Sequence, residues 1–379
     1  MIYFDHAATT PVDADVLTAI MDTLTNDYGN PSSLYQKGRE ARQIVDEARR
    51  VFAQSINAKP ADLIITSGAT ESNNTAIIGT ALALQNKGKH LITTAVEHHS
   101  VLHAMQYLET LGFDVTYLPV GRTGRVTAKQ VAEALRPDTI LVSVIYANNE
   151  VGSVNPIEEI GAVVAEHSAY FHTDAVQAYG ARAIDVEAAH IDMLATTAHK
   201  INGPKGIGFL YRRNELHLPN YLHGGTQEND HRAGTENTAY MHGFATAVTK
   251  MIANRETENA HKIALRTHFL SLLEDKKVTY SINGDNDANV SHILSMWFPS
   301  LKSDKFLIQC DLNGIMISAG SACTAGSLEP SHVLTAMFGN EDARVGESVR
   351  ISFGATNTFE EIAVFVAIIA SLQEKYTNE

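Results

Sequence analysis

A lysine follows the end of an apolar segment, in a setting that suits covalent attachment of a cofactor. The segment Thr196–Lys200 has the sequence Thr-Thr-Ala-His-Lys, and it comes directly after the apolar run 191–195. Hydroxyl side chains can bind phosphate, and a lysine crowded by cations and apolar walls has a lowered pKa and becomes nucleophilic. The pattern therefore predicts a Schiff-base lysine beneath a phosphate-bearing cofactor. A solvated surface lysine is the alternative.

An aspartate ends a second apolar segment. The stretch Phe171–Gln177 has the sequence Phe-His-Thr-Asp-Ala-Val-Gln, which places Asp174 at the end of a strand that we expect to be buried. A buried carboxylate needs a cationic partner. A protonated pyridine nitrogen would serve, and the pair would make the ring an electron sink. A helix N-cap is the alternative role for this aspartate.

A third motif opens a helix directly after a strand. The stretch Ser67–Asn74 has the sequence Ser-Gly-Ala-Thr-Glu-Ser-Asn-Asn and follows the apolar run Leu63–Thr66. Backbone N–H groups and the dipole at a helix start favour an anion. We therefore expect a phosphate site here, and a plain capping turn is the alternative.

The chain has only two cysteines, and their surroundings differ. Cys310 ends the stretch 306–310, where a cysteine packs as a small apolar residue. Cys323 lies in the glycine- and serine-rich stretch 318–330, which has almost no bulk to bury it. We therefore predict that Cys310 is a packing residue and that Cys323 is exposed and reactive. Two cysteines cannot build a disulfide framework, which fits a reducing compartment.

Motifs for several other chemistries are absent from the sequence. It contains no phosphate loop, dinucleotide fingerprint, His-Glu-x-x-His helix or nucleophile elbow. His99 and His103 are four positions apart and could share a helical face, but no carboxylate or cysteine completes a metal ligand set. We expect no metal site.

The composition is that of an ordinary globular protein. The chain has 379 residues and a formal net charge of −14. A surface this acidic repels phosphate backbones and anionic lipid, so we expect neither direct nucleic-acid binding nor membrane binding. The start of the sequence lacks a secretory signal pattern, and no run reaches the ~18 apolar residues that span a bilayer. These features predict a cytoplasmic protein.

Apolar runs alternate with helical patterns from about residue 63 to residue 211. This alternation predicts an α/β fold with a mainly parallel, seven-stranded sheet and helices on both faces. In such sheets ligands bind at the carboxyl ends of the strands. The expected strands are Leu63–Thr66, His90–Thr94, Asp114–Leu118, Thr139–Tyr146, Tyr170–Asp174, Ile191–Thr197 and Ile207–Tyr211.

A long helical stretch, 236–274, then leads to a region of different pattern. We expect a smaller α+β domain there, with an apolar segment over 290–298 and strands over 315–319 and 349–353. The resulting division is a large cofactor-binding domain, residues 15–258, and a small domain of residues 1–14 and 259–379.

In combination these motifs resemble the cysteine desulfurases of the NifS/IscS type, within the fold-type I pyridoxal-phosphate enzymes. The resemblance covers essentially the whole chain and implies the pyridoxal-phosphate-dependent transferase fold. The motifs that carry it are Asp5–Thr10, Ser67–Asn74, Val96–His98, Tyr146–Gly152, Asp174–Gln177, His199–Lys200, Arg232–Thr235, Gly320–Cys323 and Ser327–Ser331.

The resemblance implies a role for each matching residue. Lys200 is expected to bind pyridoxal 5'-phosphate covalently, Asp174 to pair with its pyridine nitrogen, and Gln177 to contact its phenolate oxygen. His98 is expected to stack on the ring, although His99 beside it leaves the register open. The remaining expectations are phosphate contacts from Ala69, Thr70, Thr197 and His199, a phosphate contact across a homodimer from Thr235, and binding of the substrate carboxylate by Asn149 and Arg350.

Two of these assignments have an alternative in the sequence itself. Arg350 alternates with apolar Val349 and Ile351, so it could be a solvent-facing strand residue. Lys205 could take the place of Lys200, but in this family a Gly-Pro-Lys-Gly turn usually follows the cofactor lysine.

The resemblance also implies the reaction. L-cysteine is converted to L-alanine, Cys323 is the nucleophile that becomes a persulfide, and His98 is the candidate acid or base. The sulfur then passes to an acceptor protein, an iron–sulfur scaffold or a tRNA-thiolation enzyme. The rival functions are a selenocysteine lyase, a transaminase or a kynureninase-like lyase on the same scaffold, and a catalytically weak scaffold for sulfur-transfer partners.

Overall fold

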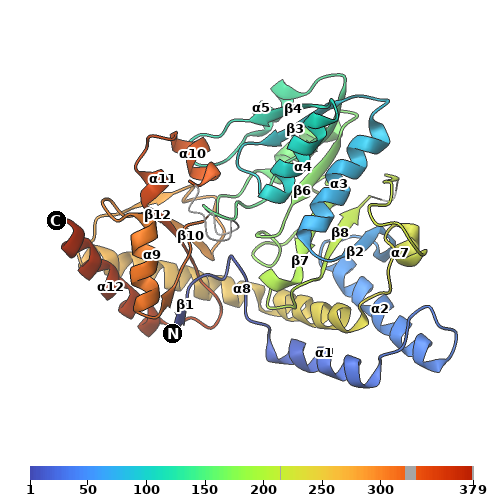
Figure 1. Cartoon of the computed structure of the whole chain (residues 1–379), viewed down its shortest axis with the longest axis horizontal. Coiled ribbons are helices and arrows are strands. Elements are labelled where there is room, and N and C mark those ends of the chain that lie inside the picture. Colours follow the sequence, from blue (N-terminus) through green and yellow to red (C-terminus); the bar gives the residue numbers. More distant parts are fainter. Residues whose placement is uncertain (214, 321–329, 378–379) are drawn as a thin grey trace.

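A seven-stranded sheet forms the centre of the computed structural model, which describes residues 1–213, 215–320 and 330–377 (Figure 1). All neighbouring strands are parallel except β8, which runs antiparallel to β2 and β7. The predicted α/β fold with a mainly parallel sheet is therefore confirmed. The strand order is β2 (Leu63–Thr66), β8 (Gly208–Arg212), β7 (Met193–Thr197), β6 (Tyr170–Asp174), β5 (Thr139–Ser143), β3 (His90–Thr94) and β4 (Asp114–Leu118).

Apolar side chains on both faces of the strands explain why the sheet is covered on both sides. Leu91 and Ile92 are neighbours in β3, yet Leu91 faces one hydrophobic core and Ile92 the other. Leu141 and Val142 of β5 divide in the same way. Successive side chains of a strand point to opposite faces, so a continuous apolar run demands helices on both.

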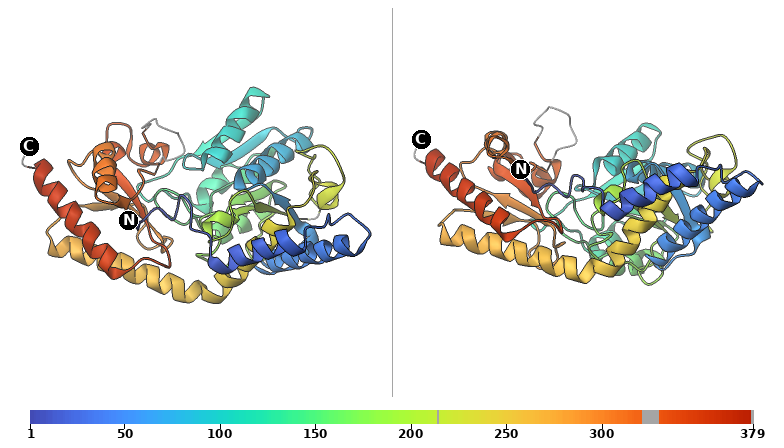
Figure 2. Two further views of the ribbon diagram at one scale, coloured as in Figure 1. Left: turned by 60° about the horizontal axis from the view of Figure 1, so that its bottom comes forward. Right: turned by 90° about the horizontal axis from the view of Figure 1, so that it is seen from below.

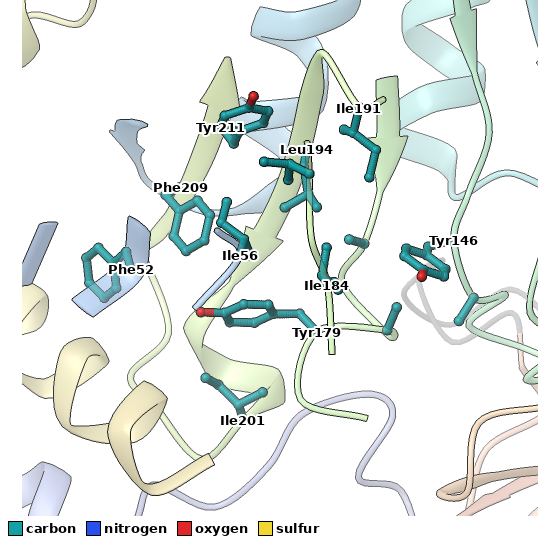
Figure 3. Packing of buried hydrophobic residues seen from close by; sticks show 14 of the residues in the cluster. Phe52, Ile56, Tyr146, Tyr179, Ile184, Ile191, Leu194, Ile201, Phe209 and Tyr211 are labelled. Carbon is teal, nitrogen blue, oxygen red and sulfur yellow. The ribbon is translucent and has the colours of Figure 1, made fainter. Parts of the chain in front are cut away.

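Each face has its own set of helices. One face is covered by α3 (Ala69–Leu84) and α4 (His99–Thr110). The other packs against α2 (Gln36–Gln54), α6 (Ile157–Ala165) and the first half of α8 (Thr238–Asp275). Figure 3 shows the aromatic part of the core on this face of the sheet, where Phe52 of α2 stacks on Phe209 of β8 at a centroid distance of 5.5 Å. The remaining elements on this part of the chain are α1 (Ala14–Asn26), η1 (Pro60–Asp62), α5 (Ala128–Ala134), η2 (Ala198–Lys200) and α7 (Gln227–Asp230).

The C-terminal part of the chain has a hydrophobic core of its own, separate from the cores on the two faces of the large sheet. Its sheet is the antiparallel set β9–β10–β12, and a short parallel pair joins β1, at the N-terminus, to β11. Figure 1 shows β1 lying among these C-terminal elements, far from the large sheet. The elements are β1 (Ile2–Tyr3), β9 (Ser281–Asn283), β10 (Ile293–Trp297), α9 (Ser303–Leu312), β11 (Ile315–Met316), α10 (His332–Phe338), α11 (Arg344–Glu347), β12 (Ser348–Ser352) and α12 (Phe359–Thr377).

Helix α8 joins the two cores. Its first half contributes Phe244 to the core beneath the large sheet, and its second half contributes Phe269 to the C-terminal core. Figure 2 shows this helix running beneath both parts of the molecule. No helix within the described ranges is long and apolar enough to cross a membrane.

Three expected strands are shorter than their apolar patterns, and one of them, β7, begins at Met193 instead of Ile191. The run 139–146 is a strand only to Ser143, where the chain turns toward the cavity described below. The run 315–319 is a strand only over Ile315–Met316, because its partner β1 has two residues. Ser318 instead pairs with Arg350 of β12.

The N-terminal segment is held by Phe4, which is fully buried between Phe353 and Phe365. Phe4→Ala should lower the free energy of unfolding by about 3–5 kcal/mol, because it leaves a cavity in a packed core. The measurement is urea unfolding followed by circular dichroism. Leu17→Ala is the matched control, since Leu17 is 50% exposed and its loss should change stability by about 0.5 kcal/mol or less. Equal effects of the two substitutions would contradict this account of the anchor.

Candidate active site

A cavity of about 660 Å³ lies at the carboxyl ends of the central strands. This is where a parallel α/β sheet places its ligands. Segments from both parts of the chain line it, including the N-terminal residues Ala7–Thr9 and Arg350 of β12. The predicted site residues along its wall are Ala69, Thr70, His98, Asn149, Asp174, Gln177, Thr197, His199, Lys200 and Arg350.

Lys200 ends the short helix η2, directly after β7, and its side chain is held by the N-terminal segment. Its Nζ donates to the carbonyl oxygens of Ala7 at 2.5 Å and Ala8 at 2.7 Å. Lys205 also lines the cavity, but it is exposed in the following turn. The fold therefore holds the side chain of Lys200, and not that of Lys205, in a fixed position between the cavity and the protein interior.

Asp174 lies at the end of β6 and is 3% exposed. Its carboxylate accepts hydrogen bonds from Asn73 Nδ2 at 2.7 Å and from the backbone N–H of Val176 at 3.0 Å. Among the described residues it forms no ion pair. A buried carboxylate that faces a cavity without a cationic partner suits a cationic ring nitrogen. A turn and not a helix follows β6, so the helix N-cap alternative is wrong, and the hydrogen bond to Val176 lies within that turn.

A chain of hydrogen bonds connects Asp174 to His98. Asn73 Nδ2 also donates to Ser100 Oγ at 2.8 Å, and Ser100 Oγ lies 2.8 Å from His98 Nδ1. Burial lowers the pKa of His98, and the charges of Lys200 and His99 act in the same direction while that of Asp174 opposes them. His98 is therefore neutral near pH 7 and can accept a proton.

Gln177 links the cavity to the N-terminal segment and to a second histidine. Its Nε2 donates to the Ala7 carbonyl at 3.0 Å, and its Oε1 lies 3.0 Å from His292 Nε2. The Ala7 carbonyl can only accept, which fixes the amide orientation of Gln177, and His292 must therefore donate to Oε1 through Nε2. Burial lowers the pKa of His292 to about 3, so this ring is neutral.

The first turn of α3 forms the polar end of the cavity. Gly68 precedes the helix with φ of 147°, and no side chain of the described chain caps the helix at this position. Thr70, Thr197 and His199 surround it. His199 Nδ1 lies 3.1 Å from Thr9 Oγ1, and burial lowers its pKa to about 4. A helix start next to hydroxyls and Lys205 suits a phosphate.

Arg350 is buried, which excludes a solvent-facing position. Its side chain is 4% exposed, Nη2 donates to Asp5 Oδ1 at 2.8 Å, and Nη1 donates to the Asn149 carbonyl at 2.9 Å. Arg350 Nε and Asn149 Oδ1 are buried and have no hydrogen-bond partner among the described residues. Arg350 Nε is a donor that suits a carboxylate, and Asn149 Oδ1 is an acceptor that suits an N–H group, so the pair suits a ligand that carries both.

Two of the predicted site residues, Thr235 and Cys323, are not among the described residues of the cavity wall. Thr235 is exposed between α7 and α8 and does not line the cavity. Cys323 lies outside the described residues, although Gly320, three positions earlier, lines the cavity. His99 and His103 lie with ring centroids 5.1 Å apart, and the described residues contain no group of three metal-ligating side chains.

The sequence did not identify Asn73, Asp5 or His292 as site residues. Asn73 is inside the motif Ser67–Asn74, but only the packing of α3 against the sheet brings it to Asp174. Asp5 lies in the N-terminal motif, and its pairing with Arg350 spans most of the chain. His292 follows no recognisable pattern.

The cysteine that the structure describes is a packing residue, as predicted. Cys310 is fully buried, and burial raises its pKa to about 12. The thiol of Cys310 is therefore shielded and protonated in the folded chain. We expect a thiol reagent such as dithionitrobenzoate to modify one thiol per native chain at pH 8, and none in Cys323→Ser. Unfolding in urea should expose the second thiol. Rapid labelling of native Cys323→Ser would contradict the assignment.

Comparisons with known proteins agree with this geometry. Residues 2–365 match the model of the aminotransferase class-V family. The chain is 49% identical to the IscS 1 protein of Bacillus subtilis (strain 168), over 99% of each chain. It is 42% identical to the cysteine desulfurase IscS of Dictyoglomus turgidum, over 99% of this chain and 95% of that one.

Solved structures give the same result. A NifS-like protein superposes with a TM-score of 0.92 at 32% identity, over 99% of each chain. A structure titled SspA in complex with cysteine superposes with a TM-score of 0.82 at 36% identity, over 94% of this chain and 100% of that chain.

Proposed function

We propose the function from one premise: the chain belongs to the aminotransferase class-V family, in its branch of IscS- and NifS-type cysteine desulfurases. The protein is a cysteine desulfurase that converts L-cysteine to L-alanine and retains the sulfur as a persulfide on Cys323. The observation that carries the proposal is that Lys200, Asp174 and Arg350 line one cavity. Gly320, three positions before Cys323 in the sequence, lines the same cavity.

The residues of the cavity fit pyridoxal 5'-phosphate. Asp174 supplies the anion for a ring nitrogen, the start of α3 with Thr70, Thr197 and His199 supplies a phosphate site, and Lys200 supplies the amine. Ala69 contributes a backbone N–H to the phosphate, Gln177 faces the phenolate oxygen, and His98 covers the ring. When bound, the cofactor takes up electron density from the substrate's α-carbon and so activates the Cβ–S bond.

The chain's own residues orient the substrate and move its protons. Arg350 and Asn149 bind the carboxylate of L-cysteine, because the guanidinium and the amide N–H groups of Asn149 can donate to it, and Asn149 Oδ1 can accept from the neighbouring ammonium. Lys200 is positioned by the carbonyl oxygens of Ala7 and Ala8 to carry a proton to and from the α-carbon. Neutral His98 accepts the proton that a thiol must lose before it attacks.

The sulfur step is balanced without an external oxidant. The thiolate of Cys323 attacks the substrate sulfur, an S–S bond forms, and the Cβ–S bond breaks. The electron pair of the broken bond stays with Cβ, which gains one proton and becomes the methyl group of alanine. Cβ is reduced and the transferred sulfur is oxidised to the sulfane level, so the products are L-alanine and a persulfide.

The sulfur then leaves to an acceptor protein in the cytoplasm, an iron–sulfur scaffold or a tRNA-thiolation enzyme. A net charge of −14 disfavours direct transfer to RNA and favours an acceptor with a basic face. We propose a homodimer in which Thr235, exposed and away from the chain's own cavity, completes the phosphate site of the partner. The two cores joined by α8 support division into residues 15–258 and residues 1–14 with 259–379.

Lys200→Ala should abolish both alanine formation and the visible absorption of the bound cofactor, because no amine would remain at the ring. The measurements are the absorption spectrum after reconstitution with pyridoxal 5'-phosphate and alanine release from L-cysteine. Lys205→Ala is the matched control and should keep the absorption band. A band retained in Lys200→Ala would move the assignment to another lysine.

Cys323→Ser should reduce alanine formation from L-cysteine by at least about 100-fold, because a hydroxyl cannot accept the sulfur. Cofactor absorption should be unchanged, and Cys310→Ser should behave as the unmodified protein. The persulfide is detected by trapping with labelled L-cysteine and peptide mass analysis. Alanine formation that survives in Cys323→Ser would instead favour a lyase or transaminase, and a protein that never binds the cofactor would favour a scaffold.

A further inference from the structure

One buried carboxylate close to the cavity has no part in the proposed chemistry. Glu150 follows Asn149 in the chain and is 3% exposed. Its backbone N–H donates to Asn148 Oδ1 at 2.8 Å, and Asn148 Nδ2 donates to the Val96 carbonyl at 2.8 Å. Burial raises the pKa of Glu150, while Ser331 and Arg350 oppose that rise. Burying a carboxylate costs free energy, so the groups around Glu150 indicate its role.

The first contact of this carboxylate lies just after the segment that contains Cys323. Glu150 Oε2 accepts a hydrogen bond from Ser331 Oγ. The same hydroxyl oxygen accepts from the backbone N–H of Leu334 at 3.0 Å and so caps α10. Helix α10 packs through Val333 and Leu334 against Val96 and Val151. Glu150 therefore holds the point where the chain enters a fixed helix.

Gly320, just before that segment, lies close to the same carboxylate. A side chain at Gly320 would place its Cβ 2.8 Å from Glu150 Oε2, and Gly320 has φ of 89°. Only glycine combines this backbone conformation with so close an approach. The N–H of Gly320 donates to Ser318 Oγ at 3.2 Å. The two ends of the chain around residues 321–329 thus meet at one carboxylate.

Arg350 is hydrogen-bonded to Ser318, close to Gly320, and to Asn149, next to Glu150. Its backbone N–H donates to the Ser318 carbonyl at 2.6 Å, and the N–H of Ser318 donates to the Arg350 carbonyl at 3.2 Å. Its guanidinium donates to the carbonyl of Asn149, the residue before Glu150. The residue proposed to bind the substrate carboxylate is therefore joined to both ends of the segment that contains the proposed nucleophile.

We propose that Glu150 is a positioning residue: its hydrogen bond to Ser331 and its close approach to Gly320 keep the residues on either side of 321–329 in register with the Arg350 site. The inference rests on the proposed function and deepens it. Glu150 acts through Ser331 and Gly320 and does not touch the substrate. A small displacement of a reacting group can cost about 100-fold in rate. Loss of the carboxylate should therefore slow sulfur transfer and leave L-cysteine binding intact, since Arg350 keeps its contacts with Asp5 and Asn149.

The test compares Glu150→Gln with the unmodified holoenzyme. We expect cofactor content and the spectral Kd for L-cysteine to stay within about threefold, and the single-turnover rate of Cys323 persulfide formation to fall at least about tenfold. Ser331→Ala, which removes only the hydroxyl, should slow the same step. The double variant should lose no more than Ser331→Ala alone, because Glu150 acts through the Ser331 hydroxyl, which also caps α10.

Glu347→Gln is the matched control. Glu347 is also a buried carboxylate of this region, but it pairs with Trp297 and Lys302 away from the cavity. It should keep the unmodified rate of persulfide formation.

Three outcomes would overturn the inference. They are a normal persulfide rate in both Glu150→Gln and Ser331→Ala, additive losses in the double variant, and an equal loss of L-cysteine affinity and rate. The failure of the proposed function itself is recognised separately, because the unmodified protein would then form neither alanine nor a persulfide.

Discussion

The hydrogen bonds from Lys200 to the carbonyl oxygens of Ala7 and Ala8 are the constraint on which the site depends. They require the N-terminal segment to leave the C-terminal core and reach the end of β7. The same few residues also contact Gln177 through Ala7, His199 through Thr9 and Arg350 through Asp5. One extended segment therefore sets the positions of the lysine, the amide and the arginine together, and Phe4 fixes the segment itself.

Burial sets the charges of this cavity as much as ion pairing does. Desolvation keeps His98, His199 and His292 neutral, so they serve as hydrogen-bonding groups and proton acceptors. Arg350 and Asp174 are ionisable side chains buried at this cavity wall, and Arg350 pairs with Asp5.

The elements could be predicted from the sequence wherever local periodicity decides them. The bounds of β2, β3, β4 and β6 match their apolar runs residue for residue. The run 315–319 did not hold as one strand, because the partner of β11 lies at the other end of the chain and has two residues. Local pattern carries no information about the length of a partner strand, so this boundary was decided by the tertiary structure.

The chemically equipped residues can be recognised in the sequence: a lysine and an aspartate at strand ends, a helix start suited to phosphate, and a cysteine in a glycine- and serine-rich stretch. Three features follow from tertiary contacts alone. Arg350 is buried, and Asn73 joins Asp174 to His98 through Ser100. Glu150 lies between Gly320 and Ser331. These contacts join residues up to 345 positions apart. The packing of the strands and helices decides which distant residues meet. The periodicity of the sequence indicates only the face of an element on which each residue lies.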